Sequence, residues 1–198
     1  MLDVAVRARL APALDRVAGS FDVRGVSPGA VTGVGLGVGV GACVAAALSA
    51  WPLALVLWLL NRTLDGLDGA LARRRGPTDL GGLLDFVADF VVYGGFVVGV
   101  AIAVPDARVA CTALLAAYLL NNVALLSFAS LVERRRLAYG DERSLVLTPG
   151  LAEGTETILA YTAFCLIPGE ADVVAWAFTA MVLVTAVQRL AMARRVLA

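Results

Sequence analysis

The chain has 198 residues, of which 60% are hydrophobic and only 16% are charged, and its mean hydropathy is +0.86. This composition excludes an ordinary soluble domain and predicts an integral membrane protein. The formal net charge is zero, every basic residue is arginine and histidine is absent, so carboxylates are the credible acid–base and metal-binding groups. The three cysteines stand alone in apolar segments, and we interpret them as buried hydrophobic residues.

The N-terminal segment, residues 1–25, mixes arginine and aspartate with apolar residues and lacks the continuous apolar stretch of a signal peptide. Its apolar residues recur at helical spacing, at Leu2, Val6, Leu10, Leu14 and Val17. This pattern predicts an amphipathic helix that lies on the membrane surface, with its arginines towards anionic headgroups.

Residues 30–193 contain long apolar segments that are separated by turn residues, and each is close to the roughly 20 residues that cross a bilayer. The predicted fold is therefore all-α, a single domain over 1–198 with one bundle of six transmembrane helices. The predicted spans are 30–50, 52–75, 81–104, 107–131, 151–167 and 172–193.

The arginines predict the orientation of this bundle. They cluster before the first span and after the second, fourth and sixth spans, whereas the opposite loops contain only Arg108. Because arginine in short loops stays on the cytoplasmic side, both termini and the loop between the second and third spans are predicted to be cytoplasmic, in the cell (inner) membrane.

The first span is rich in glycine. A dinucleotide-binding interpretation, in which Gly37, Gly39 and Ala42 loosely match GxGxxA, is disfavoured because no βαβ unit surrounds the match. Close helix packing is favoured instead. The glycines that could serve it are Gly33, Gly37 and Gly41 on one face, with Gly35 and Gly39 close by.

In the fourth span, Asn121 and Asn122 fall near the middle of the membrane. Such residues usually form hydrogen bonds between helices, and a contact with a substrate cavity is the alternative.

The segment from Asp65 to Asp89 is the most informative part of the chain. Asp65 and Asp68 share one helical face, as do Asp85 and Asp89, so two helices can aim their carboxylates at one another. An aspartate at membrane depth costs about 2.5–3.5 kcal/mol, and clustering four of them requires compensation. Hard divalent cations, Mg²⁺ or Mn²⁺ and possibly two of them, match such a set of oxygen ligands.

The same segment has features that suit a diphosphate. Arg73 lies among three consecutive arginines, and Gly69 and Gly81 remove side chains where a nucleotide could approach the helix. A site at the membrane surface, half in water and half in lipid, suits the joining of a water-soluble group to a lipid phosphate.

The pattern Asp65-x2-Asp68-Gly69-x2-Ala72-Arg73-x7-Gly81-x3-Asp85-x3-Asp89 resembles the complete signature of the CDP-alcohol phosphotransferases, membrane enzymes that make phospholipids. The resemblance implies a metal-dependent phosphatidyltransferase that uses CDP-diacylglycerol and releases CMP. Asp65, Asp68, Asp85 and Asp89 would hold the metal ions. Asp89 would also act as general base, and the CDP pocket would include Asp65, Asp68, Gly69, Ala72, Arg73 and Gly81. Homodimerisation is also expected from the resemblance.

Three alternatives compete with this interpretation. The aspartates could merely pair with Arg62 and Arg73 to Arg75, but pairing does not explain the glycines and the fixed spacing. A cation transporter or channel would carry charges at several depths rather than at one membrane face. Within the family, an enzyme that transfers from CDP-choline or CDP-ethanolamine to a lipid alcohol is the second possibility. No aromatic series suggests nucleic-acid binding.

The polar segment from Glu133 to Glu156 faces the same predicted side and gives two signals about the acceptor alcohol. Arg134, Arg135 and Arg143 could bind a phosphorylated acceptor, or could simply reflect membrane topology. Glu153, Thr155 and Glu156 could bind a polyol or an amine, or could serve the N-terminus of the fifth span.

Overall fold

The computed structural model describes residues 2–23, 25–136 and 150–197, and within these ranges it contains helices and no strands. The all-α prediction is therefore confirmed for the described part of the chain. The elements are α1 (Leu2–Val23), α2 (Pro28–Ala47), α3 (Trp51–Arg75), α4 (Asp79–Ala103), η1 (Pro105–Ala107), α5 (Arg108–Arg134), α6 (Gly154–Leu166), η2 (Pro168–Glu170) and α7 (Ala171–Leu197).

Local sequence fixes the helix ends. The hydroxyls of Ser27 and Thr78 each accept a hydrogen bond from the backbone N–H three residues later, which caps α2 and α4. Helix α3 ends at Arg75 and is followed by Gly76, whose φ of 89° lies in the left-handed region that favours glycine. Glu153 and Glu156 form a reciprocal capping box at the start of α6. Helix α6 therefore begins at Gly154, three residues after the start of the fifth predicted span, 151–167.

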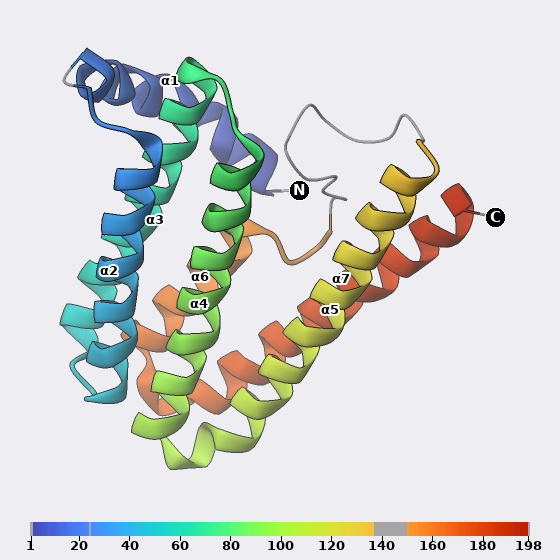
Figure 1. The fold of residues 1–198 in the computed structure, drawn as a ribbon. Helices are drawn as coiled ribbons and strands as arrows, with labels where there is room; N and C mark the ends of the chain where they lie inside the picture. The colour runs from blue at the N-terminus through green and yellow to red at the C-terminus, as the bar shows by residue number, and fades with distance from the viewer. Residues whose placement is uncertain (1, 24, 137–149, 198) are drawn as a thin grey trace.

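The helices form two groups, which Figure 1 shows clearly. Helices α2, α3 and α4 pack side by side, whereas α5 and α7 pack along each other and diverge from the first group. Helix α6 contacts both α3 and α7, and α1 lies across the end of α3. The interior between the groups is filled by aromatic side chains around Trp58, which is fully buried and stacks on Tyr161 with ring centroids 4.8 Å apart.

Close packing of α2 uses one of its two glycine faces. Gly35 and Gly39 are buried, and a Cβ at Gly39 would overlap Val92 of α4. Gly33 and Gly37 are exposed, and a Cβ at either would meet nothing within 4 Å. The predicted close packing is thus present, and within the chain it runs mainly through Gly35 and Gly39. Of the predicted face, Gly41 is half-buried, with a Cβ there 3.5 Å from Leu57 of α3.

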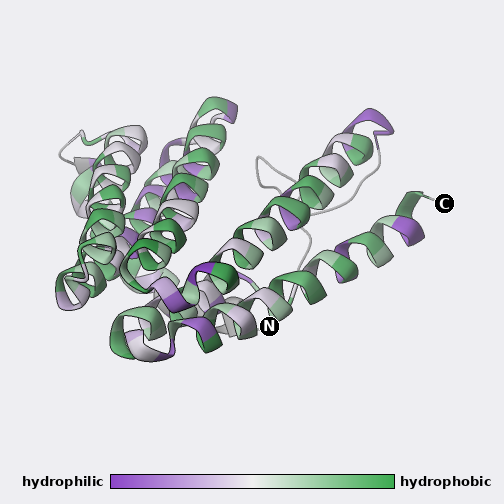
Figure 2. Ribbon diagram, turned by 90° about the horizontal axis from the view of Figure 1, so that it is seen from below, coloured by the Kyte–Doolittle hydropathy of each residue, from purple (hydrophilic) through white to green (hydrophobic). Residues whose placement is uncertain are grey.

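Within the described residues, four helical segments are long and apolar enough to cross a membrane, so the chain is a multi-pass membrane protein. They are Pro28–Ala47, Asp79–Ala103, Pro105–Arg134 and Pro168–Leu197. Helix α3 has 25 residues but is not among the four, because it carries the charged residues Arg62, Asp65 and Asp68 in its interior. Helix α6 is not among them either, because its 13 residues give a length of only about 20 Å. Figure 2 shows hydrophobic residues along the helices and hydrophilic residues at the free ends of α5 and α7.

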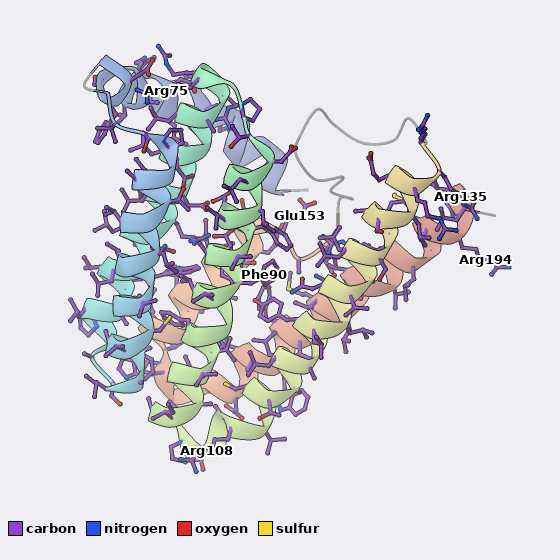
Figure 3. All side chains as sticks on the ribbon, in the orientation of Figure 1. Arg75, Phe90, Arg108, Arg135, Glu153 and Arg194 are labelled. Carbon is purple, nitrogen blue, oxygen red and sulfur yellow. The ribbon has the colours of Figure 1, made fainter. Side chains whose placement is uncertain are left out.

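The predicted N-terminal helix is present as α1, and it is tied to α3. Leu14 packs against Gly66 and Ala18 is fully buried, whereas Val17 is exposed. At the end of α1, the Arg75 guanidinium donates to Asp22 at 2.6 Å and holds the pKa of that carboxyl below its ordinary value. Figure 3 shows Arg75, Arg135 and Arg194 far from Arg108, which lies at the opposite end of the bundle.

Candidate active site

The aspartates of the motif come together in a small pocket between three helices. Helix α3 contributes Asp65 and Asp68, and α4 contributes Asp85 and Asp89, each pair about one helical turn apart. The N-terminal half of α2 closes the third side. The cavity has a volume of about 10 Å³, which is the space of roughly one water molecule or ion. A nucleotide would therefore have to lie at the mouth of the pocket.

Three of the four carboxylates are close enough to share a metal ion. One oxygen each of Asp65, Asp68 and Asp85 lies within 4.8 Å of the others. At such separations each pair of carboxylates repels by on the order of 3 kcal/mol at an effective dielectric of about 20. Asp68 is buried, and Asp65 and Asp85 are half-buried. A set of converging hard oxygen donors fits Mg²⁺ or Mn²⁺.

Asp89 is held differently. Its Oδ1 accepts a hydrogen bond of 2.9 Å from Arg62 Nη2, and its Oδ2 lies 3.4 Å from the Tyr93 hydroxyl. Asp89 is not among the three carboxylates that converge within 4.8 Å. The pocket thus contains a convergent group of three carboxylates and a fourth that pairs with a buried cation.

The arginines at the end of α3 form no ion pair with the motif aspartates among the described contacts. Arg74 and Arg75 form ion pairs with Asp22 of α1, at 3.7 and 2.6 Å. The pairing alternative therefore applies to Arg62, which reaches Asp89 and, at 3.7 Å, Asp65.

Two polar residues of the pocket were not predicted. Thr32 of α2 donates its hydroxyl to Asp68 Oδ2 at 2.7 Å. Asn61 of α3 donates to the carbonyl of Gly35 at 2.8 Å and accepts from Arg62. A threonine and an asparagine inside apolar spans were the available signals, but only the packing of α2 against α3 shows what they contact.

The residues predicted to bind CDP lie along the outer end of the site. Gly69 and Ala72 are half-buried on α3, and Arg73 and Gly81 are exposed. The N–H of Gly81 is used in capping α4, where it donates to Thr78. A Cβ at Gly69 would approach Arg73 Nη1 at 3.6 Å, so Gly69 and the Arg73 side chain are neighbours on the same helical face.

The residues predicted to bind the acceptor are more scattered. Glu153 and Glu156 use their carboxylates in the capping box of α6, and Thr155 lies in its first turn. Arg134 and Arg135 are exposed at the free end of α5, where Arg135 donates to the carbonyl of Leu197. Arg143 lies outside the described residues.

The prediction that Asn121 forms a hydrogen bond between helices is confirmed. Its Oδ1 accepts from Nη1 of Arg189 in α7 at 2.9 Å, and both side chains are buried. Arg189 was not predicted as a site residue. Its signal in the sequence is an arginine within the apolar part of the last span, separate from the terminal pair Arg194 and Arg195.

The geometry and the motif agree with the comparison to known proteins. The sequence profile of the CDP-alcohol phosphatidyltransferase family matches residues 26–191. The chain belongs to this family. It is accordingly a transferase of phosphate-containing groups, and the resemblance seen in the motif is confirmed.

Among its relatives, the inner membrane protein YnjF of Escherichia coli (strain K12) is 39% identical over 172 residues, which cover 85% of this chain and 83% of that protein. Two solved structures of the phosphatidylinositol phosphate synthase PgsA1 of Mycobacterium tuberculosis share the fold. The structure with CDP-DAG bound has a TM-score of 0.71 and 23% identity, over 91% of this chain and 92% of that one. The complex with manganese and citrate has a TM-score of 0.71 and 22% identity, over 91% and 88%.

Proposed function

We propose that this family member transfers the phosphatidyl group from CDP-diacylglycerol to the hydroxyl of a small polar alcohol and releases CMP. The observation that carries the proposal is the convergence of Asp65, Asp68 and Asp85 within 4.8 Å, beside Asp89, in a chain of this family. The solved structure of a protein with the same fold contains CDP-DAG, which supports this choice of donor.

Asp65, Asp68 and Asp85 would hold a first divalent ion, and Asp89 is the carboxylate available for a second. Mg²⁺ or Mn²⁺ bound there would neutralise the charge of the donor's diphosphate and of the departing CMP. The manganese in the PgsA1 complex and the all-oxygen donor set support this assignment.

The chain's own residues would perform the remaining tasks. Gly69, Ala72 and Gly81 leave room for the nucleotide at the pocket mouth, and Arg73 can bind a phosphate oxygen. Asp89 would accept the proton of the acceptor hydroxyl, as a general base within hydrogen-bonding distance of it. The hydroxyl oxygen would then form a bond to the phosphorus that carries the lipid, and the bond from that phosphorus to CMP would break.

In the proposed membrane arrangement, two more helices cross the bilayer in addition to the four spans of the structure. Helices α3 and α6, which correspond to the second and fifth predicted spans, would also cross the bilayer, giving six spans in all. Helix α1 would lie at the cytoplasmic surface. The grouping of Arg75, Arg135 and Arg194 away from Arg108 supports cytoplasmic termini and a cytoplasmic active site.

The acceptor is the open part of the proposal. Arg134, Arg135 and Arg143 favour a phosphorylated alcohol, and the engagement of Glu153 and Glu156 in the cap of α6 leaves them less available for a polyol or an amine. A homodimer is also proposed, because the exposed Gly33 and Gly37 would let a second helix approach closely in lipid.

The test is CMP release by the purified protein in detergent micelles. CDP-diacylglycerol is supplied with Mn²⁺ or Mg²⁺ and with glycerol 3-phosphate, inositol phosphate, serine or glycerol. A parallel reaction supplies CDP-choline and diacylglycerol. We expect CMP release with one acceptor of the first set, and its loss when EDTA removes the metal. Lack of turnover under every condition would contradict the proposal.

Asp89→Asn tests the assignment of the general base. It should abolish CMP release, because the amide cannot accept the hydroxyl proton. Asp79→Asn is the matched control on the same helix, since Asp79 is exposed in the first turn of α4. Full turnover by Asp89→Asn would remove Asp89 from this role.

A further inference from the structure

Arg62 is a buried cation that the motif does not include. It lies three residues before Asp65 on α3, and only 7% of its side chain is exposed. A guanidinium removed from water at membrane depth is costly unless it is fully partnered, and such residues usually have a function. The partners of Arg62 indicate what this function is.

The guanidinium is fixed on every side. Its Nε and Nη2 donate to Asn61 Oδ1 at 2.9 and 2.6 Å, and its Nη1 donates to the Tyr93 hydroxyl at 2.7 Å. Its carbon lies 4.9 Å from the ring centroids of both Trp58 and Tyr93. Trp58 is itself fully buried. The planar group therefore has a fixed position and a fixed plane, which a flexible lysine ammonium would not reproduce.

This fixed group holds one carboxylate of the site in particular. Nη2 donates to Asp89 Oδ1 at 2.9 Å, whereas the approach of Nη1 to Asp65 is longer, at 3.7 Å. The Tyr93 hydroxyl, which accepts from Arg62, lies 3.4 Å from the other oxygen of Asp89. Arg62, Tyr93 and Asp89 thus form a closed ring, and both carboxylate oxygens are oriented by it.

Asp89 is also distinct from the other three aspartates in its surroundings. Asp65, Asp68 and Asp85 converge within 4.8 Å without Asp89, although Asp89 lines the same pocket. The chain therefore keeps a group suited to metal binding beside a single carboxylate that is oriented by a built-in cation.

We propose that Arg62 is a positioning residue, whose fixed guanidinium orients Asp89 towards the acceptor hydroxyl. The proposal rests on the proposed function, in which Asp89 is the general base. Arg62 does not touch the reacting atoms, and its effect passes through the orientation of Asp89. Its loss should therefore lower kcat and leave the binding of the CDP-linked donor unchanged.

The experiment compares Arg62→Ala and Arg62→Lys with the wild type in the CMP-release assay, with kcat expressed per CDP-diacylglycerol binding site. We expect a fall in kcat of about 100-fold for either variant, as for other misplaced catalytic groups, with KM for CDP-diacylglycerol within about threefold of wild type. The matched control is Arg75→Lys, because Arg75 is an arginine on the same helix that pairs with an aspartate outside the site. It should keep both constants.

Chemical rescue separates positioning from a purely structural role. Millimolar guanidinium should restore part of the kcat of Arg62→Ala, because Arg62 lines the pocket and its truncation leaves space there for the free cation. Urea at the same concentration should not, because it has the same shape but no charge. Wild-type kcat in Arg62→Lys, a rise in KM that accounts for the loss, or no difference between guanidinium and urea would each overturn the proposal.

Tyr93→Phe keeps the proposal testable if the Arg62 variants do not purify as folded protein. It removes only the hydroxyl that joins Arg62 to Asp89, and we expect a fall in kcat of about tenfold, the value of one hydrogen bond. A wild-type kcat in this variant would overturn the proposal. If the wild type itself releases no CMP with any acceptor, the proposed function fails, and the role of Arg62 fails with it. Normal turnover by the wild type and the variants refutes only the role of Arg62.

Discussion

Replacing Thr32 by valine would test whether the Asp68 carboxylate is oriented for metal binding. Thr32 belongs to α2, outside the aspartate motif, and its hydroxyl donates to Asp68 Oδ2 at 2.7 Å. Valine replaces this hydroxyl with a methyl group of similar size and keeps the branched side chain. The change therefore removes this hydrogen bond, together with the longer one of 3.1 Å to the carbonyl of Pro28, and leaves the packing of α2 on α3 largely unaltered.

The size of the effect follows from the burial of Asp68, of which 5% is exposed. Because water has little access, the lost donor is not replaced, and a hydrogen bond to a charged group contributes about 1.5–3 kcal/mol. This range corresponds to a factor of roughly 10–100 in a binding constant. Removal of a residue that orients a metal ligand typically costs about the same factor in metal affinity.

The assay is the Mn²⁺ dependence of CMP release. For Thr32→Val we expect the half-saturating Mn²⁺ concentration to rise about 10–100-fold, with little change in the rate at saturating metal. Thr32→Ser is the matched control, because it keeps the hydroxyl and should retain the wild-type value. An unchanged Mn²⁺ dependence in Thr32→Val would refute the reasoning, as would an equal loss in Thr32→Ser.

Two further predictions concern stability and are read from thermal unfolding in detergent micelles. Gly39→Ala should destabilise the protein by about 1–3 kcal/mol, because its Cβ would overlap Val92. Gly94→Ala in α4, whose Cβ meets nothing within 4 Å, should be neutral or stabilising by up to about 1 kcal/mol, and equal effects would contradict the packing described. Asp22→Asn should lower the unfolding temperature at pH 6. The difference from wild type should vanish as the pH falls through the lowered pKa of Asp22, because protonation of the carboxylate removes the Arg75 ion pair from the wild type and so leaves both proteins without it; a constant difference down to pH 2 would contradict this assignment.

Helix positions were well predicted because membrane-spanning segments are long, apolar and separated by turn residues. The predicted second and third spans, 52–75 and 81–104, differ from α3 and α4 by at most two residues at either end. The fifth was less accurate at its start, because Leu151, Ala152 and Glu153 all favour a helix by propensity, whereas the capping box of Glu153 and Glu156 sets the start of α6 at Gly154.

The acceptor residues illustrate the limit of the sequence. The spacing of Glu153 and Glu156 fits a binding site and a capping box equally well. Only the backbone conformation around them shows that they form the capping box of α6. Arg189 is one of several arginines near the end of the chain, and its burial against Asn121 depends on how α5 and α7 pack. Sequence spacing describes one helix at a time and does not report such contacts.

The sequence by itself determined that the protein is helical, lies in a membrane and belongs to the CDP-alcohol phosphatidyltransferases. Helical spacing places Asp65 and Asp68 on one face, and likewise Asp85 and Asp89, so the motif can be recognised without a structure. Only the tertiary structure decided that three of these carboxylates converge while Asp89 pairs with Arg62, and that Thr32 supports Asp68. The physical reason is that these contacts join α2, α3 and α4, and their geometry depends on how closely the helices approach at Gly35 and Gly39.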